Sequence, residues 1–170
     1  MGETFLARVV FGRSVAYQRV RIHDHGYMPF QPCNSGMTPN GDIYITGGAS
    51  PDYSMEFGPA RAFFIHEMAH VWQKQNGILN PIWSAIGNTL RHGFIYSRAY
   101  RCTLRPAYDL LDYRIEQQAS IVADYYRTFI LGIGPRNDLL QNNETGEALK
   151  SLFLAVLKKF LDDPSYGRAH

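Results

Sequence analysis

The sequence predicts an α+β fold that is mainly helical, with a small antiparallel sheet placed before the central helix. Three observations predict it. Several long segments carry apolar residues at helical spacing. Two short segments, separated by a loop rich in Pro, Gly and Asn, have the patterns of strands. The chain has 170 residues, 45% of them hydrophobic, which is enough to bury one core. We therefore expect a single domain over residues 1–170.

The chain begins with a predicted short amphipathic helix over residues 3–11. Gly12 follows it and is a suitable residue to end a helix. The apolar face of this helix is predicted from the spacing of Phe5, Leu6, Val9 and Val10.

Two strands are predicted next. Residues 17–23 end in an alternation of apolar and polar side chains, which is typical of a strand with one covered face. Residues 29–42 form a predicted loop that closes on the turn pair Asn40-Gly41. A second strand is predicted over residues 43–46. We expect the two strands to pair antiparallel.

The central predicted helix spans residues 58–76, with Pro59 in its first turn and Gly77 just beyond its end. Further helices are predicted from apolar spacing over residues 81–90, 113–130 and 144–161. The remaining segments are residues 91–105, a basic and aromatic stretch that we expect to form a mobile rim, and residues 132–143, a linker.

Composition excludes several classes of protein. The net charge is +2, and the basic residues are scattered along the chain, so a nucleic-acid partner has no support. No apolar run approaches the length of a membrane span, and the N-terminus has no signal-peptide pattern. Cys33 and Cys102 lack the spacing of a cysteine zinc site, and we favour two free thiols over a disulfide. Histidine and carboxylate must then hold any metal.

The most informative motif is His66-Glu67-Met68-Ala69-His70, inside an apolar, helix-compatible run. Two histidines four residues apart project from one helix face and can bind the same ion. In a zinc hydrolase, Glu67 would take a proton from the attacking water. At this composition chance gives about 0.007 such motifs. The alternative is a buried helix whose histidines only satisfy hydrogen bonds.

A catalytic zinc ion generally has three protein ligands, so a third must come from elsewhere. A third histidine six residues after His70 is excluded, because Asn76 stands there. Of the three glutamates beyond the motif, two open the last predicted helix, where they suit its dipole. Glu116 lies in a weakly charged helix and is the predicted third ligand. The alternative is that Glu116 is a solvated carboxylate or forms an ion pair with an arginine. Asp109, Asp112 and Asp124 are then the fallback candidates for the third ligand.

Several side chains are candidates for supporting roles. Ser120 or Asp124 could hydrogen-bond a metal-bound imidazole and fix its tautomer. His23 and His25 could contribute to the site, although exposed loop histidines are the favoured interpretation. One donor could stabilise an oxyanion opposite the metal, and the candidates are His92, Tyr96, Tyr100, Tyr108 and Tyr113.

Residues 38–44, 64–73 and 113–126 together resemble the metallopeptidase effector domains of bacterial type VI secretion, which are often fused behind VgrG spike proteins. The similarity spans roughly residues 5–128. The resemblance implies a zincin-like fold with zinc on His66, His70 and Glu116, and Glu67 as the catalytic acid and base. It also implies a toxin delivered into rival cells, to the periplasm. Its partners would be a protein or peptide substrate, an immunity protein and a secretion spike.

Motif and resemblance together predict a zinc-dependent peptide-bond hydrolase. The strand over residues 43–46 could align an extended peptide by adding it to the sheet edge. One alternative is a non-catalytic binding module in which zinc only staples two helices. Another is a zinc amidase that acts on cell-wall peptides.

Overall fold

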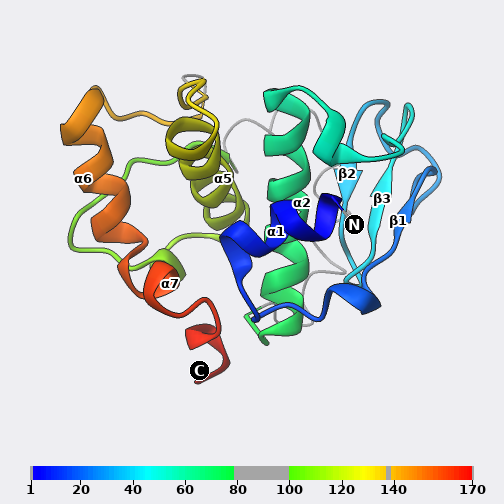
Figure 1. Ribbon diagram of the computed structural model, residues 1–170, viewed down its shortest axis with the longest axis horizontal. Coiled ribbons are helices and arrows are strands. Elements are labelled where there is room, and N and C mark those ends of the chain that lie inside the picture. Colours follow the sequence, from blue (N-terminus) through cyan, green and yellow to red (C-terminus); the bar gives the residue numbers. More distant parts are fainter. Residues whose placement is uncertain (1, 79–99, 137–138, 170) are drawn as a thin grey trace.

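The central helix α2 lies between a small sheet and the helices of the C-terminal half in the computed structural model (Figure 1). The structure describes residues 2–78, 100–136 and 139–169. Helix α2 spans Gly58–Gln75 and has Pro59 in its first turn. Gly77 follows with a φ of 73°, a left-handed conformation that suits the end of a helix. The predicted bounds of the central helix, residues 58–76, are therefore confirmed to within one residue.

The sheet has three strands among the described residues, β1 (Ile22–His23), β2 (Gly36–Met37) and β3 (Ile43–Ile45), in the order β1-β3-β2. The two predicted strands are present as β1 and β3. They pair parallel, however, so the predicted antiparallel pairing is wrong. The antiparallel partner of β3 is β2, which lies inside the predicted loop.

The turn at Asn40-Gly41 explains this difference. The Asn40 side chain accepts a hydrogen bond from the Asp42 amide, and Gly41 has a φ of 98°. The turn therefore joins β2 to β3, which leaves β1 to pair with the opposite edge of β3. Because both edges of β3 are occupied, it cannot align a peptide by adding it to the sheet, and that prediction is wrong. The edge strand beside α2 is β2.

The N-terminal helix α1 (Gly2–Phe11) is present as predicted, but its buried face is displaced by one residue. Phe5 is 70% exposed and Val9 is 50% exposed, whereas Phe11 is fully buried. The full buried face is Leu6, Ala7, Val10 and Phe11. Spacing allowed either stripe, and packing against α2 selected the one that buries Phe11.

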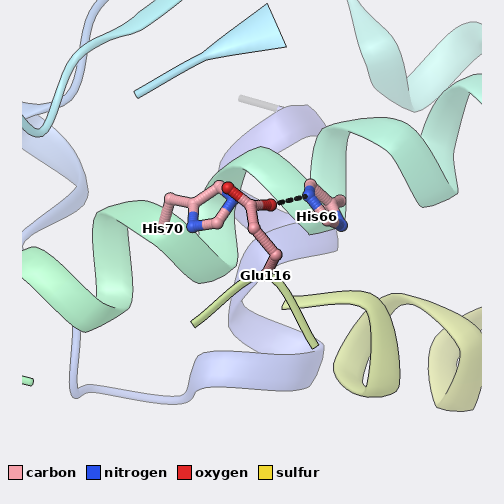
Figure 2. Close-up of side chains that lie close together, drawn as sticks. All are labelled: His66, His70 and Glu116. Atoms are coloured by element: carbon pink, nitrogen blue, oxygen red, sulfur yellow. Dashed lines mark ion pairs between the residues drawn. The ribbon is translucent and has the colours of Figure 1, made fainter. Parts of the chain in front are cut away.

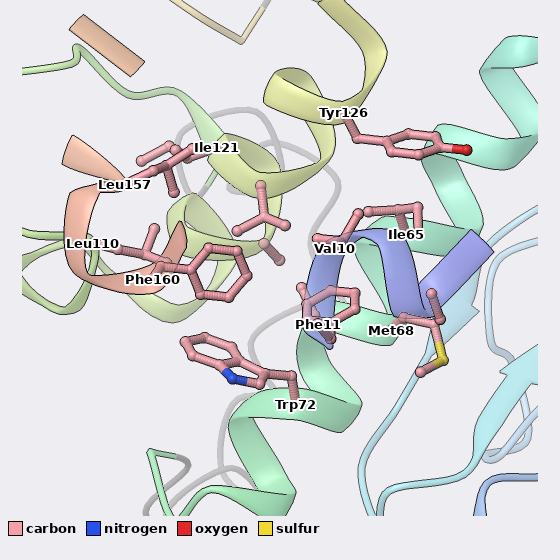
Figure 3. Close-up of a cluster of buried hydrophobic side chains, with 14 of the residues drawn as sticks. Val10, Phe11, Ile65, Met68, Trp72, Leu110, Ile121, Tyr126, Leu157 and Phe160 are labelled. Atoms are coloured by element: carbon pink, nitrogen blue, oxygen red, sulfur yellow. The ribbon is translucent and has the colours of Figure 1, made fainter. Parts of the chain in front are cut away.

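A cluster of aromatic rings joins α1, α2 and the C-terminal helix α7 (Lys158–Asp162) in the core (Figure 3). The ring centroid of Phe11 lies 6.4 Å from that of Trp72 and 5.9 Å from that of Phe160. Trp72 and Phe160 meet edge to face at 5.0 Å. The Trp72 indole also donates to the Pro164 carbonyl, at 2.6 Å. This cluster anchors the C-terminal half of α2 in the core.

The two later helices also follow the sequence. Helix α5 (Ile115–Tyr125) continues into a π-helical turn (Tyr126–Ile130), which confirms the helix predicted over residues 113–130. The helix predicted over residues 144–161 is divided into α6 (Gly146–Val156) and α7. The break falls at Leu157, which is fully buried and has a ψ of 3°. No helix-breaking residue stands there, so the apolar spacing gave no sign of the break.

Shorter features complete the description. Short 3-10 turns are Tyr17–Arg19, Tyr53–Met55, Leu110–Asp112 and Tyr166–Ala169. Both cysteines are free, Cys33 exposed and Cys102 buried. Among residues 2–78, 100–136 and 139–169, each helix is too short or too polar to span a lipid bilayer. The helix predicted over residues 81–90 and most of the predicted rim lie outside the described residues.

The two phenylalanines of α1 give a matched test of its buried face. Phe11→Ala is expected to lower the free energy of unfolding by about 3–5 kcal/mol, because it leaves a cavity beside Trp72 and Phe160. Phe5→Ala should change it by less than about 0.5 kcal/mol, since Phe5 faces solvent. Urea unfolding followed by circular dichroism measures both. Equal losses would show that the wrong face has been assigned.

Candidate metal centre

Two histidines of α2 and one glutamate of α5 converge on a common point (Figure 2). One carboxylate oxygen of Glu116, Oε2, lies 3.4 Å from Nε2 of His66 and 3.2 Å from Nε2 of His70. The two imidazole rings are 4.9 Å apart and nearly perpendicular, at 83°. The structure thus brings together the three side chains that the sequence predicts as metal ligands.

The local fold explains this convergence. His66 and His70 lie one turn apart on α2, and Glu116 lies in the first turn of α5, which packs against α2. The α5 residues nearby are small and buried. They are Ala119, Ser120 and Ala123. Small side chains allow the two helix axes to approach closely, so that a carboxylate from one helix can reach imidazoles of the other.

The donor atoms fit a metal ion. In tetrahedral zinc coordination, nitrogen and oxygen ligands at their usual bond lengths are roughly 3.4 Å apart. The two separations from Glu116 agree with this value. Glu116 Oε2 is buried and faces the Nε2 atoms of both histidines. A buried carboxylate oxygen in that position is suited to accept a cation. Two nitrogens and one oxygen form a donor set that zinc accepts.

The metal-free cluster is an ion pair. Burial alone would lower the pKa of His70, but the charges of Glu116 and Glu67 and the acceptor Gln73 outweigh burial and raise it to about 9. Burial alone would raise the pKa of Glu116, but the two histidines outweigh burial and hold it well below its usual range. At neutral pH His70 is therefore protonated and Glu116 ionised.

Glu67, the predicted catalytic base, is buried and held from the sheet side. Thr38, just after β2, donates its hydroxyl to Glu67 Oε2 at 2.7 Å. At Gly36 in β2, an added Cβ atom would lie only 2.4 Å from Glu67 Oε1. Neither supporting residue was predicted from the sequence. Neither carries charge or a helical spacing that signals the contact, although Thr38 lies within the segment that resembles known effectors.

The imidazole of His70 is supported by Gln73, a residue that was not predicted for this role from the sequence. Its Nδ1 lies 2.8 Å from Oε1 of Gln73, which is one turn further along α2 and fully buried. Ser120 was predicted for such a role, but its hydroxyl makes no hydrogen bond to a described residue. Asp124, the other candidate, accepts a hydrogen bond from the Arg136 amide instead.

The fallback ligands lie elsewhere. Asp109 accepts hydrogen bonds from the Leu111 amide and the Tyr166 hydroxyl, and Asp112 accepts one from the Asp109 amide. These contacts make a capped turn before α5. Asp124 is buried in α5 but does not belong to the converging group. The position of Glu116 therefore favours it over all three aspartates.

The additional histidines form a separate cluster on the sheet. His23 stacks on Tyr44 with ring centroids 4.4 Å apart and pairs with Asp42 at 3.1 Å. His25 is exposed and lies against the same tyrosine, with ring centroids 5.7 Å apart. Neither joins the converging group. The favoured interpretation as exposed loop histidines holds for His25, whereas His23 is half-buried in β1.

Of the candidate oxyanion donors, Tyr100 lies closest to the site among the described residues. Its ring centroid is 5.7 Å from that of His66. Tyr108 and Tyr113 pack on one another, and the Tyr113 hydroxyl accepts from the Arg105 amide. The remaining candidates, His92 and Tyr96, lie outside the described residues.

A pocket of about 330 Å³ opens between α2 and α5 beside the converging side chains. His66, Glu67 and Tyr100 line one part of it. The rest of the lining combines apolar and polar side chains, namely Pro59, Ala62, Phe63, Ser120, Ala123, Asp124, Arg127, Arg136 and Leu139. Burial raises the pKa of Asp124 to about 6. With a volume of about 330 Å³, the pocket can hold a side chain or a small group next to Glu67.

Fold and site together define an α+β domain with a candidate His-His-Glu metal centre between two helices. No protein-family model matches the chain. A solved structure, the effector domain of Pseudomonas aeruginosa VgrG2b, is 36% identical, with a TM-score of 0.67. The match covers 82% of this chain and 80% of that one. The chain therefore belongs to the family of the VgrG2b effector domain.

The same relationship is found with a complete spike. The type VI secretion system spike protein VgrG2b of Pseudomonas aeruginosa is 40% identical over 164 residues. The match covers 94% of this chain but only 14% of the spike protein. The chain is therefore homologous to the effector part of a type VI secretion spike, and it spans a small part of that relative.

Metal binding can be tested through stability. Zinc at 100 times its dissociation constant should stabilise the wild-type protein by about 2.7 kcal/mol, because only the native state presents the site. His66→Ala and Glu116→Ala should abolish this gain. His23→Ala, which alters a histidine in the separate cluster, is the matched control and should keep it. Thermal unfolding and metal analysis of the purified proteins measure the effect. Undiminished gains in both site variants would contradict the assignment.

Proposed function

We propose that the chain is a zinc-dependent peptide-bond hydrolase that acts as an effector of type VI secretion. The observation that carries the proposal is the position of Glu67. It directly follows the ligand candidate His66 on α2, and both side chains line the pocket between the helices. A carboxylate held beside three converging donor atoms is the arrangement that metal-assisted hydrolysis requires.

Zinc, when bound, would polarise a carbonyl group and make a water molecule more acidic. The candidate ligands would be His66, His70 and Glu116. Glu67 would accept the proton of the attacking water and deliver it to the leaving amine. The Thr38 hydrogen bond orients the Glu67 carboxylate for both transfers. Tyr100, beside His66, is our candidate for the donor to the oxyanion.

A peptide substrate would lie in extended form along β2. This strand is the sheet edge nearest the site, since Gly36 lies against Glu67. An added strand pairs its backbone with such an edge, and its alternate side chains point to either face. One of those side chains would enter the pocket between α2 and α5. The described lining gives it apolar walls and the polar groups of Ser120 and Asp124.

The zincin-like architecture and the site of action belong to the same proposal. Homology to the effector part of a spike protein supports delivery by type VI secretion into other bacterial cells. We propose the periplasm of the target cell as the place of action, and an immunity protein as the partner that protects the producer. A zincin-like arrangement is supported by the order of the elements, in which a small sheet precedes the helix with both histidines.

Two rival functions remain distinguishable. A structural zinc site generally has four protein ligands, whereas the described residues offer a group of three. This count supports catalysis over a non-catalytic, zinc-stapled module. A zinc amidase acting on cell-wall peptides would use the same site. Mass analysis of the products formed from purified peptidoglycan and from periplasmic proteins separates the two enzymes.

Glu67→Gln is expected to reduce kcat by at least about 100-fold, because an amide cannot accept the proton of the attacking water. Zinc stoichiometry should stay unchanged, since Glu67 is not among the converging ligands. Glu147→Gln, which alters an exposed glutamate at the start of α6, is the control for loss of one charge. Peptide hydrolysis and metal content are measured on the same preparations. A Glu67→Gln protein with wild-type kcat would refute the mechanism.

Zinc affinity should depend on pH. Since the pKa of His70 is raised to about 9, this histidine carries a proton at pH 7 that must leave before zinc binds. Glu116 is already ionised there, because its pKa is lowered. The apparent affinity should therefore rise about tenfold per pH unit between pH 7 and 9 from this proton alone. Titration calorimetry in two buffers of different ionisation enthalpy measures the proton release. Affinity that is constant over this range would contradict the prediction.

A further inference from the structure

Two glutamines are buried beside the candidate metal centre. Gln73 on α2 is fully buried, and Gln118 on α5 is 2% exposed. A primary amide has two donor hydrogens and one acceptor oxygen, and burying it without partners is costly. The hydrogen bonds of these two amides connect α2 with the start of α5, and they end on His70.

The backbone determines the direction of this hydrogen-bonded chain, because a carbonyl group can only accept. Gln118 donates its Nε2 to the Tyr113 carbonyl at 2.7 Å, so its Oε1 faces the other way. Gln73 donates its Nε2 to that Oε1 at 3.0 Å and to the Ile115 carbonyl at 2.9 Å. Both donor hydrogens of Gln73 are then in use.

The oxygen of Gln73 is left to face Nδ1 of His70, at 2.8 Å. Rotating the Gln73 amide by 180° would place its oxygen against two acceptors, the Ile115 carbonyl and Gln118 Oε1. That arrangement would leave buried groups unpaired, which costs free energy. Nδ1 of His70 therefore carries a hydrogen. Nε2, which lies 3.2 Å from Glu116 Oε2, is the nitrogen that would coordinate zinc.

The same amide also positions the third ligand. The carbonyl that Gln73 holds belongs to Ile115, the residue immediately before Glu116. A single side chain of α2 thus contacts one ligand directly and fixes the backbone next to another. A shift of α5 along α2 would break this contact and separate the carboxylate of Glu116 from His70.

We propose that Gln73, oriented by Gln118, is a positioning residue of the metal centre. It fixes the tautomer of His70 with the hydrogen on Nδ1, and it sets the register of α5 on α2. Nε2 of His70 and the carboxylate of Glu116 consequently face the same point before an ion arrives. The inference rests on the proposed zinc site and adds to it the two residues that prepare it.

The first test is spectroscopic. In protein labelled with 15N-histidine, long-range 1H–15N correlation spectra identify which nitrogen of His70 carries the hydrogen. We expect a hydrogen on Nδ1 both in the zinc-loaded protein and in the metal-free protein, because Gln73 offers only an acceptor there. An Nδ1 without a hydrogen in either state would overturn the inference. Because the metal-free measurement does not depend on zinc, a wild-type protein that fails to bind zinc would refute the proposed function separately.

The second test is zinc affinity, measured by competition with a chromophoric chelator. Gln73→Leu keeps the approximate side-chain volume and is expected to weaken zinc binding by about 10–100-fold. It should also speed the exchange of the Nδ1 hydrogen with solvent. Gln118→Leu removes the group that orients Gln73 and should cause a smaller loss of affinity in the same direction. If Gln73→Leu fails to fold, this second variant and the wild-type spectrum still decide.

Gln75→Leu is the matched control. Gln75 lies on the same helix, and its Oε1 accepts from the Ala16 amide at 2.7 Å, away from the converging side chains. Its loss should lower stability and leave zinc affinity within twofold of wild type. An equal loss of zinc affinity in the Gln75 and Gln73 variants would show that the loss comes from lower protein stability, and it would overturn the inference. Wild-type affinity in Gln73→Leu would also overturn the inference.

Discussion

The packing of α5 against α2 is the constraint on which the candidate site depends. His66 and His70 come from one helix and Glu116 from the other, so their convergence exists only at one register of the pair. Small buried residues of α5 let the helices approach, and the buried amides of Gln73 and Gln118 tie them together. Since the relevant atoms are 3.2 and 3.4 Å apart, a slip of one residue along either helix would disperse the group.

The other faces of α2 are fixed as firmly. Toward the sheet, Gly36 and Thr38 lie against Glu67 and leave its carboxylate little freedom. In the core, Trp72 of α2 packs with Phe11 of α1 and Phe160 of α7. Helix α2 is consequently surrounded by packed groups on most of its circumference. This arrangement explains why its sequence lacks the one-sided apolar stripe of a surface helix. The ionisable side chains in the middle of α2 are those of the site, His66, Glu67 and His70.

The sequence predicted those parts of the site that depend on local spacing or unusual charge. The helical repeat links His66 with His70, Glu67 directly follows His66, and Glu116 stood out as a carboxylate in a weakly charged helix. The roles of Thr38, Gln73 and Gln118 were not predicted, because neutral polar residues acquire such roles only through contacts across the fold. The same limit explains the fold errors. The direction of β1 relative to β3 depends on where β2 inserts. Which face of α1 is buried depends on which of its two apolar stripes contacts Trp72.

The ion pair between His70 and Glu116 explains how such a site can form before it receives a metal ion. An isolated carboxylate in this buried position would be costly, and the protein would relieve the cost by neutralising the group or separating the helices. The proton held by His70 compensates the charge, and the acceptor Gln73 stabilises the protonated ring from its other side. Zinc would then exchange one positive partner of Glu116 for another, while the helices keep their places. The geometry of the site is therefore a property of the fold, and the metal would add the reactivity.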